Sequence, residues 1–355
     1  MSGGRILAVE SSCDETAVAV VEGGRRIVAS VIASQVQLHS ATGGIVPEVA
    51  ARAHLRWMIP VLEEARERSG LDDWREVDAV AVTEGPGLAG SLLVGITMAK
   101  TLAWSVGLPL VPVNHLEGHI YAAWLLDPEE EEKPAPEFPL VALVVSGGHT
   151  FIVEMADHLH YRLLGQTVDD AAGEAFDKVG RLLGLSYPGG PAIMKAAAGA
   201  TAHDRRFPRA WMGESFDFSF SGLKTAARHE VAQALGLPAE TRELDGADLA
   251  EQDVAELAWA FQESVVDVLS SKLLRAARET GARSIILGGG VAANAVLRER
   301  IDDGARGLGL PLIVPRPGLC TDNAAMIGAA GYHRHLAGAR GDRSLDARPS
   351  LKLAV

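Results

Sequence analysis

The feature that most constrains the fold is a strand–turn–strand pattern that occurs twice. Near the N-terminus, apolar runs at 6–9, 17–21 and 27–31 are separated by short polar segments. Much later, apolar runs at 140–145 and 151–155 flank a Ser-Gly-Gly-His-Thr turn. Short apolar runs bounded by glycine and polar residues are typical of strands. The pattern indicates one design used twice, in which a tight turn carries polar side chains or bare glycine backbone.

The length of the chain predicts two domains. Its 355 residues are 48% hydrophobic, which is enough for a substantial core and exceeds the commonest size of a single domain. Residues 127–139 are acidic and proline-rich, so we expect an exposed loop there that marks the main boundary. We expect an N-terminal lobe of residues 1–132 plus 321–355, which returns through a C-terminal helix, and a second lobe of residues 133–320.

Composition argues against several classes of protein. Two cysteines, Cys13 and Cys320, make no disulfide framework and favour a reducing cytoplasm. The N-terminus resembles no signal peptide, and no stretch approaches the ~20 apolar residues of a membrane helix. The formal net charge is −13, whereas a protein that grips nucleic acid alone is usually basic. A nucleic-acid substrate would therefore require partner proteins or a local basic patch.

Periodicity predicts the remaining elements more coarsely. The predicted helices and strands are a helix at 47–70, a buried strand at 77–85, and helices at 92–106, 169–184 and 249–280, then a strand at 283–290, a helix from 292 and a last helix from about 321. Residues 200–246 are charged and are predicted to be less regular. Three arginines in this stretch, Arg205, Arg206 and Arg209, are candidates for phosphate contacts, although such charge runs are usually solvated surface.

A histidine pair is the first candidate site. His115 and His119 stand four residues apart in a stretch that is compatible with a helix, which would place both on one face. Asp322, at the predicted start of the last helix, would complete a set of two histidines and one carboxylate with open metal positions. The alternative is that Thr321 or Asp322 caps the helix. The pair lacks the glutamate of the H-E-x-x-H zinc-protease signature.

The turns and glycine loops are the second group of candidates. Gly147 and Gly148 allow close approach of a ligand, and consecutive amides there can form an anion nest, unless the segment is an ordinary hairpin turn. The first turn carries Asp14 and Glu15, which would crowd a phosphate unless a cation intervenes. A glycine-rich loop follows the strand at 283–290, and Asn294 in it is suited to bonding a ribose or base, or to capping a helix.

Nine motifs occur together and in a fixed order. They are VESSCDETA, GGIVPEVAARAH, GPGLAGSLLVG, NHLEGHIYA, LVVSGGHT, DDAAGEAFDKVGRLLGLSYPGGP, FSFSGLKT, GGGVAANAVLR and TDNAAMIG. This series resembles the universal tRNA threonylcarbamoyl transferase family from about Arg5 to Gly331. The departures are the acidic insertion at 127–137 and the tail after about Arg340.

The resemblance implies an α/β fold of the actin/Hsp70/sugar-kinase (ASKHA) class, with two similar lobes and a central cleft. It implies that one divalent metal, iron (Fe²⁺) before zinc (Zn²⁺), is held by His115, His119 and Asp322. The implied substrate contacts are Val144, Val145, Ser146, Gly147, Gly148, Asp177, Gly190 and Asn294. Asp14 or Glu15 would be catalytic and accept a proton.

The implied reaction transfers a threonylcarbamoyl group from threonylcarbamoyl-adenylate to the exocyclic amine of adenosine 37, in tRNAs that read codons beginning with A. AMP is released. The implied partners are tRNA, a paralogous subunit of the same ASKHA fold and a small P-loop ATPase, all in the cytoplasm and without a membrane.

Three other functions compete with this interpretation. A kinase-like ATPase or small-molecule carbamoyltransferase can share the fold, because fold does not fix function. A non-catalytic nucleotide-binding scaffold would lack the histidine pair that this chain has. A metalloprotease is the weakest alternative, since the residue after His115 is Leu116 rather than glutamate.

Overall fold

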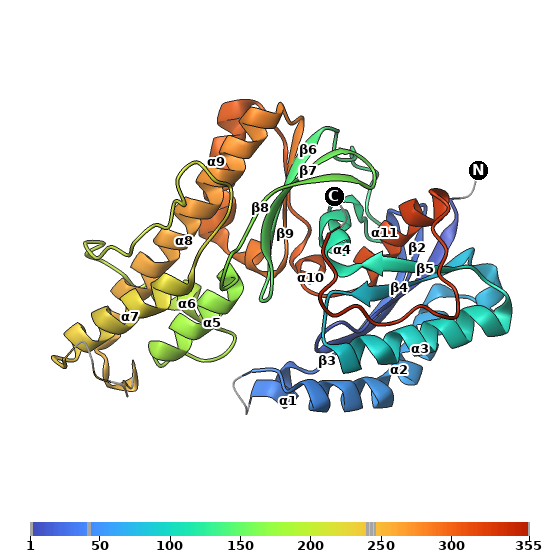
Figure 1. Cartoon of the computed structure of the whole chain (residues 1–355), viewed down its shortest axis with the longest axis horizontal. Helices are drawn as coiled ribbons and strands as arrows, with labels where there is room; N and C mark the ends of the chain where they lie inside the picture. The colour runs from blue at the N-terminus through green and yellow to red at the C-terminus, as the bar shows by residue number, and fades with distance from the viewer. Residues whose placement is uncertain (1–2, 41–43, 239–240, 242–243, 245, 354–355) are drawn as a thin grey trace. The chain divides into compact units, whose positions relative to one another are not determined.

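The computed structural model describes residues 3–40, 44–238, 241, 244 and 246–353, and the chain divides into two compact units. The first unit comprises Met1–Pro136, Asp157–Tyr161 and Gly318–Val355, and the second comprises Glu137–Ala156 and Arg162–Pro317. Figure 1 labels their helices and strands. Each unit contains one five-stranded sheet with helices.

The first unit is built on a mixed sheet in the order β3-β2-β1-β4-β5. Its strands are β1 (Arg5–Glu10), β2 (Glu15–Glu22), β3 (Arg26–Ser34), β4 (Ala79–Gly85) and β5 (Leu110–Asn114). Its helices are α1 (Val36–Ser40), α2 (Pro47–Ser69), α3 (Ala89–Val106), α4 (His115–Tyr121) and α11 (Ala324–Leu336), with 3₁₀ turns at Trp74–Glu76 and Ala122–Trp124. The β1–β2 and β2–β3 pairs are antiparallel, whereas β1–β4 and β4–β5 are parallel.

Alternate residues of these strands face two different helical layers. Leu7 and Val9 belong to a core with residues of α2 and α3. Ala8 and Ala81 lie on the opposite face, where α11 approaches the sheet closely at Gly328 and Gly331. A β-carbon at either glycine would come within 2.7 Å of Val21 or 2.6 Å of Ala81. The two glycines therefore let α11 lie directly on the strands, which fixes the position of the segment that precedes it.

The second unit has a sheet in the order β10-β9-β6-β7-β8. Its strands are β6 (Leu140–Val145), β7 (Thr150–Asp157), β8 (His160–Gln166), β9 (Ser284–Gly288) and β10 (Leu312–Ile313). Its helices are α5 (Ala172–Leu182), α6 (Gly189–Ala197), α7 (Ser221–Ala234), α8 (Glu251–Thr280) and α9 (Ala295–Leu308), with 3₁₀ turns at Gly246–Asp248 and Gly290–Ala293, and α10 (Pro317–Cys320) follows.

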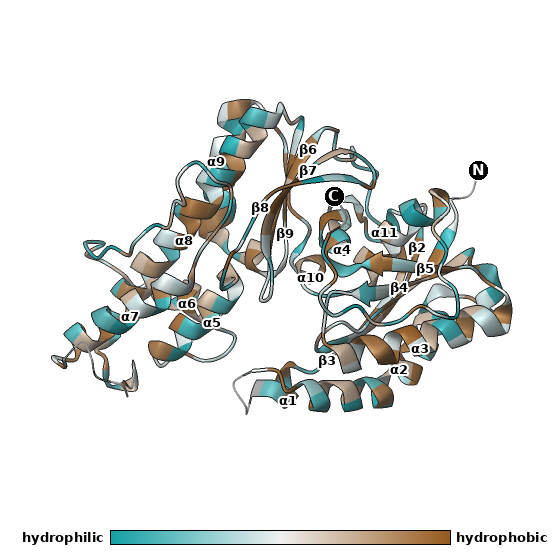
Figure 2. Ribbon diagram, in the orientation of Figure 1, coloured by the Kyte–Doolittle hydropathy of each residue, from teal (hydrophilic) through white to brown (hydrophobic). Residues whose placement is uncertain are grey.

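The two sheets share one topology. In each, the first hairpin is antiparallel, and the first strand of that hairpin also pairs in parallel with the strand that follows a helical segment. β6 is continuously apolar and β1 is apolar between Arg5 and Glu10, whereas α2 shows hydrophilic and hydrophobic residues alternating along its length (Figure 2). The duplicated hairpin that the sequence predicts is therefore confirmed, and it extends to the whole strand order.

Several boundaries differ from the sequence expectation. Glu10, Glu15 and Thr16 belong to strands β1 and β2, so the first polar turn is only four residues long. The stretch 200–246, expected to be irregular, contains the 14-residue helix α7. The strand β8 has no counterpart among the expected elements. Both missed elements have polar exposed faces and become stable only by packing against the rest of the unit.

One helix is apolar enough to resemble a membrane span. α3 has the length and composition of such a segment. It packs, however, against α2 and β4 and contributes Leu92, Ile96 and Ala99 to the core of the first unit. It is therefore a core helix here.

Candidate metal centre and nucleotide-binding turns

The histidine pair lies on a short helix whose start is fixed by one side chain. Strand β5 runs directly into α4, and the Asn114 side chain accepts a hydrogen bond from the Leu116 amide at 2.9 Å. The same side chain donates to the Lys352 carbonyl in the C-terminal tail at 2.9 Å. With the helix so capped, the i, i+4 spacing brings the rings of His115 and His119 to a centroid distance of 4.7 Å.

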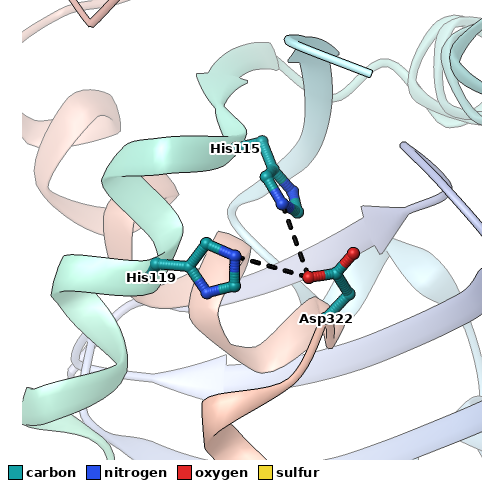
Figure 3. A group of neighbouring side chains, drawn as sticks. All are labelled: His115, His119 and Asp322. Atoms are coloured by element: carbon teal, nitrogen blue, oxygen red, sulfur yellow. Dashed lines mark ion pairs between the residues drawn. The ribbon is translucent and has the colours of Figure 1, made fainter. Parts of the chain in front are cut away.

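Asp322 completes the group from a distant part of the sequence. It lies between α10 and α11, and Figure 3 shows its carboxylate pointing toward both imidazoles. Its Oδ1 is 3.5 Å from His115 Nε2 and 3.4 Å from His119 Nε2. The cap of α11 is Asn323, whose side chain accepts from the Met326 amide at 2.9 Å. The alternative, in which Thr321 or Asp322 caps this helix, is therefore wrong, and Asp322 faces the histidines.

The three side chains fit a divalent metal ion. His119 is 1% exposed, and neither of its ring nitrogens has a hydrogen-bond partner of normal geometry in the described part of the chain. Because buried polar atoms are normally satisfied, an orphaned imidazole calls for a ligand. A metal with bonds of ~2.1 Å keeps its ligand atoms roughly 3 to 3.4 Å apart, close to the measured separations. Two histidines and one carboxylate also leave positions open for a substrate.

Charge is concentrated around this group. Burial raises the pKa of Asp322, but the charge of His115 and contacts with both imidazoles outweigh it and hold the pKa well below its usual range. Burial likewise opposes protonation of His115, yet Asp322 and Glu10 raise its pKa well above the ordinary value. Asp322 is therefore an anionic ligand that an imidazolium or a metal cation can balance.

Glu15, the first residue of β2, lies within electrostatic reach of Asp322. Glu15 accepts a hydrogen bond from the Ser34 hydroxyl at 3.0 Å. Burial, followed by the charges of Asp14 and Asp322, raises the pKa of Glu15 to about 9. Glu15 therefore keeps its proton at neutral pH, and a cation bound beside Asp322 would favour its release. Burial and the same carboxylates raise the pKa of Cys13, so its thiol is protonated and a nucleophilic role is not favoured.

In the second unit, β6 ends in a tight turn with open space above two glycines. The Ser146 amide donates to the His149 carbonyl at 2.8 Å, and the His149 amide donates to the Ser146 hydroxyl at 3.1 Å. A β-carbon built on Gly147 or Gly148 would meet no atom within 4 Å. Packing does not require glycine at either position. Glycines at such positions are consistent with a backbone that a ligand approaches closely.

The neighbouring glycines are different, because the fold itself requires them. A β-carbon on Gly173, in the first turn of α5, would lie 2.5 Å from the Ser146 carbonyl oxygen. Gly289 follows β9 with φ +86°, and its β-carbon would lie 2.4 Å from the Val145 carbonyl oxygen. Because both residues lack a side chain, α5 and the loop after β9 can pack directly against the backbone of the Ser146 turn. The side chains of Val144 and Val145 are buried in the sheet, so only their backbone can contact a ligand.

Asp177 on α5 contacts the start of α6, next to Gly190. The Asp177 carboxylate accepts a hydrogen bond from the Gly189 amide at 2.7 Å, at the first residue of α6. Burial raises its pKa although that hydrogen bond partly opposes the effect. Gly190 is the next residue, and a β-carbon there would meet no atom within 4 Å. The structure thus brings Asp177 beside a second open glycine.

Asn294 has a structural role in the described contacts. Its Oδ1 accepts from the Leu297 amide at 3.0 Å and caps α9, and its Nδ2 donates to Gln262 Oε1 at 2.8 Å. Of the two interpretations open at the sequence level, the capping role is observed. One amide N–H of Asn294 is left for a further partner.

The arginine cluster is mostly engaged within the second unit. Arg205 pairs with Glu230 and Asp253, and Arg209 pairs with Asp267. Arg206 differs, because it is exposed and lies over the Trp259 ring at 5.3 Å. Two of the three candidate phosphate contacts are therefore used internally, which their spacing in the sequence could not indicate.

Sequence reasoning missed one residue of the first site. Glu10 is fully buried and bonds His115, although in the sequence it appears as the first of a run of polar turn residues. The available signal was a glutamate that ends an otherwise apolar strand.

Comparison with known proteins identifies the family. Residues 26–329 match the family model described as tRNA N6-adenosine threonylcarbamoyltransferase. A protein of that description from Thermomicrobium roseum is 54% identical over 99% of this chain and 97% of its own length. Another, from Symbiobacterium thermophilum, is 50% identical over 100% of this chain and 98% of its own length.

Solved structures agree on the fold. HypF from T. kodakarensis has a TM-score of 0.63 at 14% identity and covers 95% of this chain, which spans 49% of that protein. The activator of 2-hydroxyisocaproyl-CoA dehydratase from Clostridium difficile has a TM-score of 0.51 at 17% identity, covering 94% of this chain and 96% of that one. The ASKHA-type fold expected from the motifs is confirmed. Because its sequence matches this family along nearly its whole length, the chain belongs to the tRNA N6-adenosine threonylcarbamoyltransferase family.

Proposed function

We propose that the chain transfers the threonylcarbamoyl group of threonylcarbamoyl-adenylate to the exocyclic amine of adenosine 37, in tRNAs that read codons beginning with A. The observation that carries this proposal is the full-length match to proteins named for that reaction, at about half of all positions. The His115, His119 and Asp322 group supports it, because those residues offer a metal site with open positions.

In this proposal the second unit binds the AMP half of the donor. The open backbone at Gly147 and Gly148 receives the phosphate of the AMP half. Asp177 receives the ribose hydroxyls, and Gly190 and Asn294 lie near the adenine. The threonylcarbamoyl end goes to the metal group of the first unit. A divalent metal, with Fe²⁺ ahead of Zn²⁺, would supply Lewis-acid polarisation of the carbonyl when bound.

The chemistry assigned to the chain's own residues is positioning and proton transfer. The adenosine amine forms a C–N bond to the carbamoyl carbon, and the C–O bond to the phosphate breaks, so AMP leaves with the electron pair. Asp14 or Glu15 accepts the proton that the amine loses. Because an exocyclic amine is a weak nucleophile, orientation of the donor supplies much of the rate. An adenosine in an anticodon loop is accessible without opening a duplex.

Exposed apolar residues support the proposed partner subunits. Leu55 and Ile59 are 67% and 58% exposed, one turn apart on α2, and Val36 and Leu38 of α1 are exposed as well. We propose that this surface binds the paralogous ASKHA-fold subunit, and that a small P-loop ATPase joins the assembly. Leu55→Glu with Ile59→Glu should abolish co-purification with the paralogue. Leu336→Glu on α11, a residue 66% exposed, is the matched control and should not.

The location proposed for this reaction is the cytoplasm. The two cysteines form no disulfide in the described structure, which agrees with a reducing compartment.

A transfer assay tests the function. Purified protein with its partners, threonylcarbamoyl-adenylate and an unmodified tRNA transcript should yield the modified nucleoside on digestion, together with one AMP per modification. A transcript with guanosine at position 37 should remain unmodified. AMP release without modified tRNA would favour a small-molecule carbamoyltransferase instead. Elemental analysis of the same preparation identifies the metal.

A further inference from the structure

A buried carboxylate lies directly behind one of the two histidines. Glu10 is the last residue of β1 and is 0% exposed. Its Oε2 is 3.0 Å from His115 Nδ1 and accepts the Thr83 hydroxyl at 2.6 Å. Its Oε1 accepts the Ser12 amide at 2.5 Å. The turn after β1 and strand β4 therefore both hold this side chain, so its position is fixed independently of α4.

The hydrogen-bonding roles of these atoms determine the state of the His115 ring. An ionised carboxylate can only accept hydrogen bonds, so the atom facing it, Nδ1, carries a proton. The remaining nitrogen, Nε2, is the one that points toward Asp322 at 3.5 Å. With Nδ1 protonated, the lone pair of Nε2 is free for a metal ion. The Ser12 hydroxyl, 3.1 Å from Nδ1, can rotate to suit this arrangement.

The second histidine has no comparable support. His119 Nδ1 is buried without a hydrogen-bond partner among the described residues. The two histidines therefore differ: Nδ1 of His115 faces a carboxylate, whereas Nδ1 of His119 has no hydrogen-bond partner among the described residues.

We infer that Glu10 is a positioning residue, which orients the His115 ring and selects the tautomer whose Nε2 binds the metal. This inference rests on the metal site of the proposed function. Carboxylates that accept from the second nitrogen of a ligating histidine raise its basicity and fix its orientation, and their loss typically lowers metal affinity about 10- to 100-fold. A buried carboxylate is costly for a fold to retain, which a role of this kind explains.

Glu10→Gln is a sharp test, because it preserves the shape of the side chain and replaces one hydrogen-bond acceptor with a donor. The Ser12 amide requires an acceptor, so the new amide oxygen takes the Oε1 position. The amide nitrogen then faces His115 Nδ1 and donates to it. That arrangement favours the opposite tautomer, in which a hydrogen on Nε2 points at the metal position.

The chain offers a matched control on the same helix. Glu117 lies between the two histidines, is 1% exposed, and pairs with Arg334 at 2.8 Å. Glu117→Gln removes the same charge from a buried position in the same unit, without contact to either ligating ring. It should lower stability and leave metal binding unchanged.

The experiment measures Co²⁺ affinity and the visible Co²⁺ spectrum of the full-length protein, by competition with a chelator. Glu10→Gln should bind Co²⁺ about 10- to 100-fold more weakly and with an altered spectrum, whereas Glu117→Gln should match the wild type. Wild-type affinity in a folded Glu10→Gln protein would overturn the inference and leave the metal site standing. Failure of the wild type to bind Co²⁺, Fe²⁺ or Zn²⁺ would overturn the metal site as well.

A second measurement does not depend on the variant folding. Long-range ¹H–¹⁵N spectra of the wild-type Zn²⁺ protein, with His115→Gln for assignment, should show Nδ1 of His115 protonated and Nε2 bound to metal. Metal bound through Nδ1 would contradict the inference directly.

Discussion

The first turns of the two sheets occupy equivalent places in one topology but present different chemistry. The turn after β1 ends with Asp14 and is followed by Glu15, in the unit that holds the histidine pair and Asp322. The turn after β6 presents Gly147 and Gly148, whose backbone faces open space. The strand frame is the same, so it cannot be what sets the ligand. Carboxylates suit a cation, and bare amides suit an anion.

The comparison also shows how each turn is supported. The acidic turn follows Glu10, a buried side chain that reaches His115 through the interior of its unit. The glycine turn is held by backbone contacts, where Gly173 and Gly289 allow close packing around it. In the first unit, substitutions should impair function by removing a polar or charged side chain. In the second unit, they should impair function by adding side-chain volume at the glycine turn.

The largest effect is expected at the metal group. His119→Ala removes a ring that faces Asp322 at 3.4 Å but makes no hydrogen bond of normal geometry to a described residue, so the fold should persist. Bound metal should be lost, and the transfer rate should fall at least ~100-fold. Elemental analysis and the tRNA assay measure both quantities, and circular dichroism checks the fold. Full metal content in a His115→Ala, His119→Ala protein would refute the site.

Added side-chain volume at the glycine turn should weaken ligand binding without lowering the stability of the protein. Gly147→Ala with Gly148→Ala adds two methyl groups that meet no protein atom. Unfolding should be unchanged, whereas affinity for AMP should fall about tenfold, or ~1.4 kcal/mol. Calorimetry measures the affinity.

The control for the glycine turn is Gly173→Ala. Its β-carbon would lie 2.5 Å from the Ser146 carbonyl oxygen, so it should destabilise the protein by about 1–3 kcal/mol. An equal loss of stability in Gly173→Ala and in the Gly147→Ala, Gly148→Ala protein would contradict the distinction between open and packed glycines.

Asp177 should separate the donor from the tRNA. Asp177→Asn keeps an acceptor for the Gly189 amide and loses the charge proposed to bind the ribose hydroxyls. We expect affinity for AMP to fall several-fold, by about 1 kcal/mol, with tRNA affinity unchanged. The larger substitution Asp177→Ala should weaken nucleotide binding further and also destabilise α6. A nucleotide affinity equal to the wild type in Asp177→Ala would exclude a contact.

The two units should lose stability on acidification in different pH ranges. In the first, burial and the charge of nearby His158 lower the pKa of His333 to about 4. An unfolded histidine takes up its proton near 6.5, so this contribution is present above pH 6.5 and is lost as pH falls toward 4. In the second unit, hydrogen bonds from the Ala202, Thr201 and His203 amides lower the pKa of Glu256 to about 2. Its contribution is present above about pH 4.5 and is lost as pH falls toward 2.

Hydrogen exchange of the metal-free protein, corrected for intrinsic rates, measures these two ranges. Protection in the first unit should fall from pH 6.5 to 4, and His333→Phe should reduce that fall. Protection in the second unit should fall between pH 4.5 and 2, and Glu256→Gln should weaken it at neutral pH and flatten the fall. One shared transition for both units, unaffected by either substitution, would contradict the assignment.

The smallest effect concerns the arginines. Arg205→Ala with Arg206→Ala was the natural pair from sequence, but Arg205 is bound to Glu230 and Asp253. Arg206→Ala alone should weaken tRNA binding by the assembled complex and flatten its salt dependence by about 0.7 to 0.9 log units per log unit of salt. Arg205→Ala should lower stability and leave the slope unchanged. Identical slopes for the wild type and Arg206→Ala would show that Arg206 is solvated surface.

Much of this protein follows from the sequence alone. Apolar runs bounded by turns predicted the hairpins of both sheets, because strand and turn signals are local. The ordered motifs predicted the family and the fold, which the comparisons confirm. The spacing of His115 and His119 predicted one helical face, which α4 provides.

Other features depended on contacts between residues far apart in the chain. Asp322 faces the histidines only because α11 packs against α4, which lies much earlier in the chain. Glu10 became a partner of His115 only because β1 and α4 meet inside one unit, 105 residues apart. Arg205 and Arg209 form ion pairs with Asp253 and Asp267, which their positions in the sequence do not indicate. Local patterns determine elements and their faces, whereas the partner of a polar side chain is set by packing, which brings distant segments together and excludes water.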